Sequence, residues 1–220
     1  MVAILGLPLL GQTVTLYDST GDSPSGSDSI AEFGPLGFSF TTNSSATSLS
    51  DVKLGLSPTG VLAAVVRRRS AAVTLSGPGI NVEVCANNPS GPQPANPCTQ
   101  IGAVSDSSVT GVTLVDVPVS PTVPLSPDTR YWIGLTVPSS SSLSFDFSET
   151  IGGTGVSTEF NFFNGRTFPN NTTFGAYIGS VTSTTNSAPP PATPAPASLL
   201  LTFAGLAGVG FWLAWRAKSA

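Results

Sequence analysis

The sequence has few charged residues and no histidine. Of its 220 residues, 12 are Asp or Glu and 8 are Lys or Arg, which makes 9% charged, whereas an average soluble domain has about 25%. A coiled coil, a helical bundle or a charged disordered tail would need many more charges. The absence of histidine removes the most common general base and the most common metal ligand. Most hydrolase and metalloenzyme hypotheses are therefore disfavoured.

Basic residues are also scarce. The formal net charge is −4, and the only run of positive charge in the first 200 residues is Arg67, Arg68 and Arg69. Binding to DNA or RNA depends on many Lys and Arg side chains that displace counterions from the phosphates. We therefore expect no nucleic-acid partner.

Hydroxyl and turn residues supply the polarity instead. The chain contains 56 Ser and Thr, 23 Gly and 20 Pro. Short runs of alternating apolar and polar residues, separated by turn residues at intervals of about ten, are typical of a sandwich or barrel. The predicted strands cover residues 13–17, 52–56, 80–84, 112–117, 131–137, 143–147, 159–163 and 176–181. We also expect a hairpin over residues 61–75. The pattern predicts an all-β fold, an antiparallel jelly-roll-like β-sandwich, over residues 12–184.

The chain ends in a long apolar run. Residues 198–215 contain no charge, and a helix of that length covers about 27 Å, close to the roughly 30 Å of a hydrocarbon core. The predicted membrane anchor includes Leu199, Leu200, Leu201, Gly205, Gly208, Gly210, Trp212 and Trp215. Arg216 and Lys218 follow and should stay on the cytoplasmic side. We therefore predict a transmembrane helix and basic tail over residues 198–220; the alternative is a helix buried in a soluble core.

A proline-rich linker, residues 185–197, precedes this helix and should be extended. Together, Pro194, Ala195 and Pro196, the apolar helix and the basic terminus resemble a bacterial PEP-CTERM sorting signal. The resemblance implies processing by an exosortase-like enzyme, after which the protein reaches the cell surface or extracellular matrix. Ala195 stands where that signal usually has Glu, and the basic cluster is reduced, which bears on processing more than on membrane insertion.

The first 11 residues are apolar but lack a preceding basic residue and a small-residue cleavage site. A C-terminal anchor with its cargo outside the cytoplasm requires export of the N-terminus. We therefore interpret residues 1–11 as the remnant of a signal peptide and expect Met1 to lie inside a longer signal.

Four segments of the predicted sandwich resemble the choice-of-anchor R domain, a module of bacterial surface proteins. They are residues 16–42, 49–57, 125–135 and 153–170. The resemblance implies an extracellular module that is joined to one of several C-terminal anchors. It carries no settled biochemical activity to this chain.

Cys85 and Cys98 are the only cysteines, and turn residues separate them. A disulfide that closes a loop of about 14 residues contributes roughly 3 kcal/mol in the chain-entropy model and suits an exported protein. A metal site would need further Cys or His ligands nearby. We therefore predict a structural disulfide.

Three acidic residues, Asp18, Asp22 and Asp28, occur in one Gly- and Ser-rich segment. Oxygen ligands on turns suit Ca²⁺, but the spacing matches no defined calcium loop. They are candidates for a structural calcium site, and the alternative is that they are solvated turn residues. We expect no other cofactor.

A second acidic set, Asp146, Glu149 and Glu159, could supply the two carboxylates of a glycoside hydrolase. Such a set is more often one polar face of a sheet, and no Ser has an evident activating base. We therefore expect no enzymatic activity, with an enzyme acting on envelope glycans as the remaining alternative.

Strand alternation puts Tyr131 and Trp132 on opposite faces. The ring that faces outward is a candidate carbohydrate contact; the alternative is packing in the core. We expect Arg130 to cap a strand or to pair with Asp128.

Taken together, these features predict an exported, non-enzymatic protein. It would be anchored in the inner membrane through its C-terminus, with the sandwich outside the cytoplasm, and then move to the cell surface or extracellular matrix. The main alternative is a carbohydrate-binding module that contacts extracellular polysaccharide.

Overall fold

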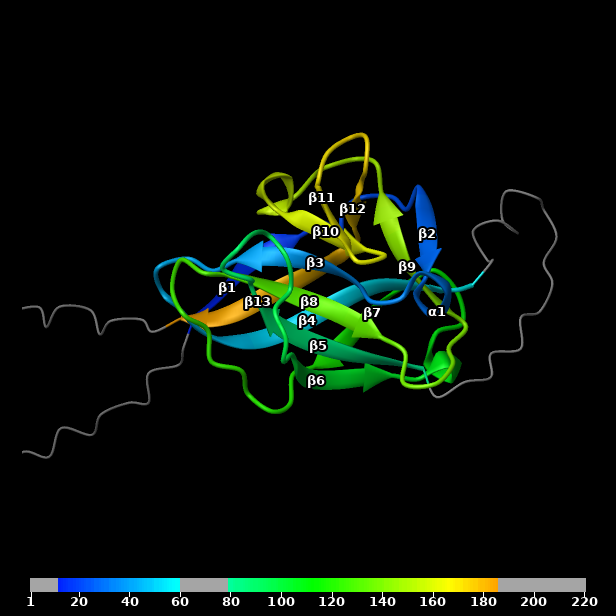
Figure 1. Ribbon diagram of the computed structural model, residues 1–220, viewed down its shortest axis with the longest axis horizontal. Helices are drawn as coiled ribbons and strands as arrows, with labels where there is room; N and C mark the ends of the chain where they lie inside the picture. Colours follow the sequence, from blue (N-terminus) through cyan, green and yellow to red (C-terminus); the bar gives the residue numbers. More distant parts are fainter. Residues whose placement is uncertain (1–11, 60–78, 186–220) are drawn as a thin grey trace, which may run out of the picture. The chain divides into compact units, whose positions relative to one another are not determined.

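A computed structural model describes residues 12–59 and 79–185 (Figure 1). The predicted signal remnant, the hairpin expected over residues 61–75, the linker beyond residue 185 and the membrane helix lie outside these residues. In the part of the chain that is described, no helix is long and apolar enough to cross a membrane.

Two antiparallel sheets form the structure, which confirms the prediction of an all-β sandwich. The elements are β1 (Gln12–Asp18), β2 (Gly26–Ser29), α1 (Ile30–Phe33), β3 (Leu36–Thr41), β4 (Ala46–Pro58), β5 (Ile80–Ala86), β6 (Thr99–Val104), η1 (Asp106–Ser108), β7 (Thr113–Pro118), β8 (Arg130–Thr136), β9 (Leu143–Ser148), η2 (Val156–Thr158), β10 (Phe160–Phe163), β11 (Arg166–Pro169), β12 (Ala176–Tyr177) and β13 (Gly179–Thr185). The seven-stranded sheet has the order β1-β13-β4-β9-β12, with β2 paired to β9 and β7 to β4. The six-stranded sheet has the order β11-β10-β3-β8-β5-β6.

Each predicted strand within the described residues overlaps an observed strand. The prediction over residues 176–181 is too coarse, because the chain there forms two strands separated at Ile178, whose N–H donates to the Asp146 carbonyl at 2.9 Å. Four strands were not predicted: β2, β3, β6 and β11. The single-turn helix α1 was also missed; the Ser29 hydroxyl caps it by accepting from the Glu32 N–H.

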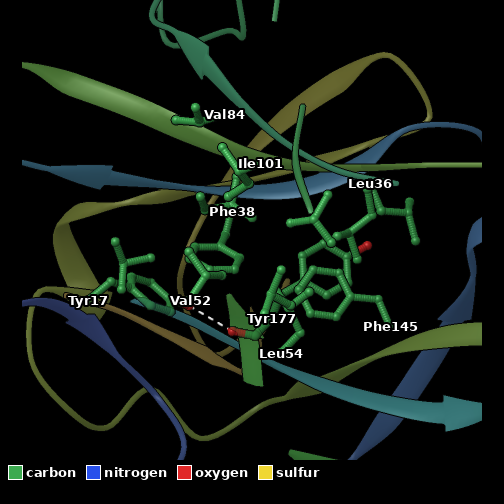
Figure 2. Packing of buried hydrophobic residues seen from close by; sticks show 14 of the residues in the cluster. Tyr17, Leu36, Phe38, Val52, Leu54, Val84, Ile101, Phe145 and Tyr177 are labelled. Carbon is green, nitrogen blue, oxygen red and sulfur yellow. Dashed lines mark hydrogen bonds between the residues drawn. The ribbon is translucent and has the colours of Figure 1, made fainter. Parts of the chain in front are cut away.

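The core lies between the sheets and is built by strand alternation. Val52, Leu54 and Leu56 of β4 are fully buried, as is Phe38 of β3 in the other sheet. Aromatic rings fill the centre (Figure 2): Tyr17 stacks on Phe38 with 4.4 Å between centroids. The Tyr17 hydroxyl donates to the Tyr177 carbonyl at 2.7 Å. This bond satisfies a polar group that would otherwise be costly to bury.

The two ends of the sandwich lie side by side. Gln12 of β1 pairs with Thr185 of β13, and the two strands run antiparallel along their length (Figure 1). The segments that precede residue 12 and follow residue 185 therefore attach at neighbouring points.

Candidate functional site

Cys85 and Cys98 form a disulfide, as predicted. Cys85 lies on β5. Cys98 immediately precedes β6, which pairs with β5. Between them, the chain closes a turn-rich loop in which the Asn88 N–H donates to the Gln93 carbonyl at 2.7 Å. The bond thus holds a loop over the outer face of the six-stranded sheet.

This loop explains why Trp132 is not exposed. Alternation does put Trp132 on the outer face, while the ring of Tyr131 packs against the core. However, Trp132 is only 1% exposed. Its indole N–H donates to Asn87 Oδ1 at 2.9 Å, and its ring meets Phe162 edge-on. The prediction of an exposed carbohydrate-stacking ring is therefore wrong for Trp132, whereas Tyr131 is half-buried and faces the core.

The three carboxylates proposed as a calcium site do not converge. Asp18 accepts from the N–H and hydroxyl of Thr20, two residues further on. Asp22 accepts from the Gly152 N–H at 3.1 Å, and Asp28 accepts from the Tyr177 hydroxyl at 2.8 Å. Within the described ranges, the only group of three side chains near enough to share an ion is Glu83, Cys85 and Cys98. Its two sulfurs are already bonded to each other, so it does not form a metal site.

The second acidic set is also separated. Glu159 is 2% exposed and lies just before β10, where it accepts from the hydroxyls of Ser39 and Thr41 on β3. Arg130 on β8 donates to it at 3.0 Å and also lies over the Phe160 ring. Arg130 therefore pairs with Glu159, and the expected pairing with Asp128 is wrong. All the donors around Glu159 come from the six-stranded sheet.

Asp146 belongs to the other sheet and has a different environment. It is 1% exposed on β9 and accepts from the Ser57 hydroxyl at 2.6 Å. Its second oxygen, Oδ2, has no hydrogen-bond partner among the described residues. Burial raises the pKa of Asp146 to about 6, and the Ser57 hydrogen bond opposes that shift only in part. Asp146 thus lies on β9 of the seven-stranded sheet, whereas Glu159 lies beside β3, β8 and β10 of the six-stranded sheet.

A cavity of about 390 Å³ in the described residues is lined mainly by aromatic side chains; we call it the aromatic cavity. Its aromatic residues are Phe147, Phe163, Phe168, Phe174 and Tyr177. Its polar residues are Asp28, Glu149, Asn161 and Thr173. They come from β2, β12, β9 and the residue after β9 in one sheet, and from β10, β11 and the loop after β11 in the other; these segments lie together in Figure 1.

Asn161 fixes one wall of the aromatic cavity. Its amide nitrogen donates to the Gly175 carbonyl at 3.1 Å, and its oxygen accepts from the Tyr177 N–H at 3.2 Å. Gly175 has a φ of +69°, and a Cβ there would lie 2.7 Å from the Ser148 carbonyl oxygen. Glycine is therefore required for β12 to approach β9 this closely. Tyr177 then stacks on Phe145 with centroids 4.3 Å apart.

A tight turn holds Phe174 at the edge of the cavity. The side chain of Asn171 accepts from the N–H groups of Thr173 and Phe174, and the Asn171 carbonyl accepts from the Gly175 N–H. The Phe174 ring packs against Phe168 with 5.0 Å between centroids but remains 49% exposed. An ordered turn thus presents an apolar ring to solvent beside the cavity.

The aromatic cavity has an acidic electrostatic character. Burial raises the pKa of Asp28, while its hydrogen bond from Tyr177 opposes the shift. Glu149 is exposed at the cavity, and none of the lining residues is basic. The ion pairs in the described part of the chain are Lys53–Asp116 and Arg130–Glu159, so neither Asp28 nor Glu149 has a cationic partner there.

Sequence reasoning did not identify the aromatic cavity. Phe163 and Tyr177 fall in predicted strands, but their shared cavity depends on how the two sheets meet. One local signal was available: Asn171 followed by Thr and Thr is typical of a side-chain-capped turn, and it precedes the exposed Phe174. Comparison with protein-family models, with curated proteins and with solved structures finds no match.

Proposed function

We propose that this chain is an exported, non-enzymatic β-sandwich protein of the bacterial cell envelope or extracellular matrix. The observation that carries the proposal is the disulfide between Cys85 and Cys98. Structural disulfides persist in oxidising compartments outside the cytoplasm and are rare inside it. The disulfide therefore supports export of the sandwich.

The C-terminal sequence supports membrane anchoring of the exported sandwich. A proline-rich linker, an uncharged run over residues 198–215, and the basic residues Arg216 and Lys218 occur in the order of a PEP-CTERM-like signal. In this proposal, the run forms a membrane helix, the sandwich lies outside the cytoplasm, and an exosortase-like enzyme processes the tail. The jelly-roll-like strand arrangement and the kinship with choice-of-anchor R domains belong to the same proposal.

The positions of the candidate acids support a non-enzymatic role. Hydrolysis of a glycoside needs two carboxyl groups that flank one bond. Glu159 is occupied by Arg130 and two hydroxyls, Asp146 is buried beside Ser57, and only Glu149 lines the aromatic cavity. The three residues therefore do not supply such a pair. The other carboxylate of the aromatic cavity, Asp28, accepts a hydrogen bond from the Tyr177 hydroxyl at 2.8 Å. The polysaccharide contact at Trp132 is not retained, because that ring is buried.

Cell fractionation tests this proposal. The full chain and a variant that lacks residues 194–220 are expressed in a bacterium that has an exosortase, each from the native reading frame with the complete signal of which residues 1–11 are expected to be the remnant. We expect the full chain in the membrane and surface fractions and the truncated chain in the periplasm or medium. Replacement of both Arg216 and Lys218 by Gln is the matched control for the basic terminus and should reduce correct membrane orientation. Recovery of the full chain in the soluble cytoplasmic fraction would contradict the proposal.

A further inference from the structure

We propose that the aromatic cavity binds a quaternary ammonium group. This inference goes beyond the proposed function and does not depend on export. It rests on three features of the described residues: the sign of charge in the cavity, the kind of rings that line it, and the scarcity of free hydrogen-bond donors.

The charge in the cavity favours a cation. Asp28 and Glu149 supply two carboxyl groups, and the lining contains no Lys or Arg. Burial disfavours the ionised form of Asp28, as its raised pKa shows. A bound cation would offset that cost, since an opposite charge nearby favours the ionised carboxylate. An anionic ligand would instead meet repulsion from both carboxylates.

The rings specify the type of cation. The faces of aromatic rings are electronegative and attract cations, and quaternary ammonium groups are the ligands for which proteins characteristically build aromatic enclosures. Four Phe side chains and Tyr177 line this cavity. The apolar methyl groups of a quaternary ammonium can pack on these rings, whereas a small metal ion would need six or more oxygen ligands.

Hydrogen-bond capacity disfavours a neutral sugar. Sugar hydroxyls require several polar groups that are free to pair with them. The amide of Asn161 is already engaged by Gly175 and Tyr177, and the Tyr177 hydroxyl donates to Asp28. Thr173 is the one remaining neutral polar side chain in the lining. So few free neutral hydrogen-bonding groups suit a ligand that makes few hydrogen bonds.

The cavity is also organised before any ligand binds. Asn161 fixes the segment that carries Tyr177, and the Asn171 turn fixes Phe174 against Phe168. Rings that are already held in place lose little conformational entropy when a ligand arrives. The exposed Phe174 then gains cover from the methyl groups of the ligand.

Calorimetric titration with choline tests the inference directly. The full chain is held in a polyoxyethylene detergent, which carries no ammonium group. We expect saturable binding of choline and of tetramethylammonium. The neutral isostere 3,3-dimethylbutan-1-ol, which has the shape of choline without its charge, should bind at least ten-fold more weakly. Equal binding of the isostere, or no heat from choline up to 10 mM, would overturn the proposal.

Variants locate the site. Phe174→Ala and Glu149→Gln should each weaken choline binding about ten-fold, because each removes one ring or one charge of the cavity. Leu114→Ala removes an apolar side chain of similar exposure and Glu32→Gln removes an exposed charge, both outside the cavity, and both should leave affinity unchanged. Circular dichroism of each variant checks that the sandwich is intact. Equal loss in the control variants would place binding elsewhere and overturn the proposal.

Two further titrations identify the source of the ammonium group and exclude a sugar. Binding to phosphatidylcholine vesicles indicates a lipid headgroup, whereas binding to glycine betaine alone indicates a free solute; either result supports the proposal. A neutral oligosaccharide that binds saturably, loses binding in Phe174→Ala and is not displaced by choline would overturn it.

Discussion

The side-chain bonds that link neighbouring strands differ between the two sheets of the sandwich. The six-stranded sheet carries the Cys85–Cys98 disulfide and the ion pair of Arg130 with Glu159. The seven-stranded sheet has an exposed ion pair, Lys53 with Asp116, and hydroxyl pairs between β4 and β13, such as Ser50 with Thr182 at 2.9 Å. It also contains the buried carboxylate of Asp146, which accepts one hydrogen bond.

The contrast shows how a chain with few charges uses them. Glu159 and Asp146 are buried to the same degree, at 2% and 1% exposed. Glu159 accepts from one guanidinium and two hydroxyls, so its charge is compensated. Asp146 accepts from Ser57 only, and its pKa rises to about 6. The buried charge of Glu159 therefore has three partners, whereas burial disfavours the ionised form of Asp146 and lowers stability at neutral pH.

Removal of Glu159 should have the largest effect. Glu159→Ala leaves Arg130 and the Ser39 and Thr41 hydroxyls without their acceptor, and breaking a buried pair in this way costs about 4 kcal/mol. Urea denaturation at pH 7 measures the loss in the free energy of unfolding. Glu149→Ala, at an exposed position, is the control and should change it by less than about 0.5 kcal/mol. A loss below about 1 kcal/mol for Glu159→Ala would show that the network is not stabilising.

Loss of the disulfide should have the next largest effect. Replacement of both Cys85 and Cys98 by Ser frees a loop of about 14 residues and should lower the free energy of unfolding by about 3 kcal/mol. Trp132 fluorescence should also become more solvent-sensitive, because the loop that covers it is released. Unchanged stability in the presence and absence of a reducing agent would contradict this expectation.

Replacement of Asp146 by a neutral residue should raise the free energy of unfolding, in contrast to the two changes above, and the gain should depend on pH. Its folded pKa lies above its ordinary value of 3.8, so its contribution to stability falls as pH rises from about 4 to about 6. Asn is a neutral counterpart of the protonated acid. The stability of Asp146→Asn relative to the parent should therefore increase by about 2 kcal/mol between pH 4 and pH 7.5. Chemical denaturation at both pH values measures it, and a pH-independent difference would contradict the account.

The hydroxyl pairs should have the smallest individual effects. Ser50→Ala removes one pair with Thr182 and should cost about 0.5 to 1 kcal/mol. Thermal unfolding at pH 7 measures the change. A loss above about 2 kcal/mol would contradict this expectation and show that a single hydroxyl pair is important for the stability of the seven-stranded sheet.

Sequence alternation predicted the strands whose inner face is apolar, such as residues 52–56. It missed β2, because Gly26–Ser29 contains no apolar residue and becomes a strand only by pairing with β9. It also missed β3, although Phe38 and Phe40 alternate with Ser39 there.

For the candidate sites, the sequence pattern was informative only about residues that lie close together along the chain. Two cysteines with turn residues between them were enough to predict the disulfide. Alternation put Trp132 on the outer face, but the loop that covers it is a tertiary feature. The aromatic cavity joins Asp28 to residues 147–177, and that meeting depends on β2 pairing with β9 and on the approach of β10 and β11.

The state of the cysteines in living cells tests the central claim of export most directly. Cells that produce the full chain are quenched in acid, and free thiols are alkylated with a polyethylene-glycol maleimide before any oxidation can occur. Export predicts that Cys85 and Cys98 are oxidised and resist alkylation until a reductant is added. If both thiols react at once in the mature protein, the sandwich resides in a reducing compartment, and the proposed function is contradicted.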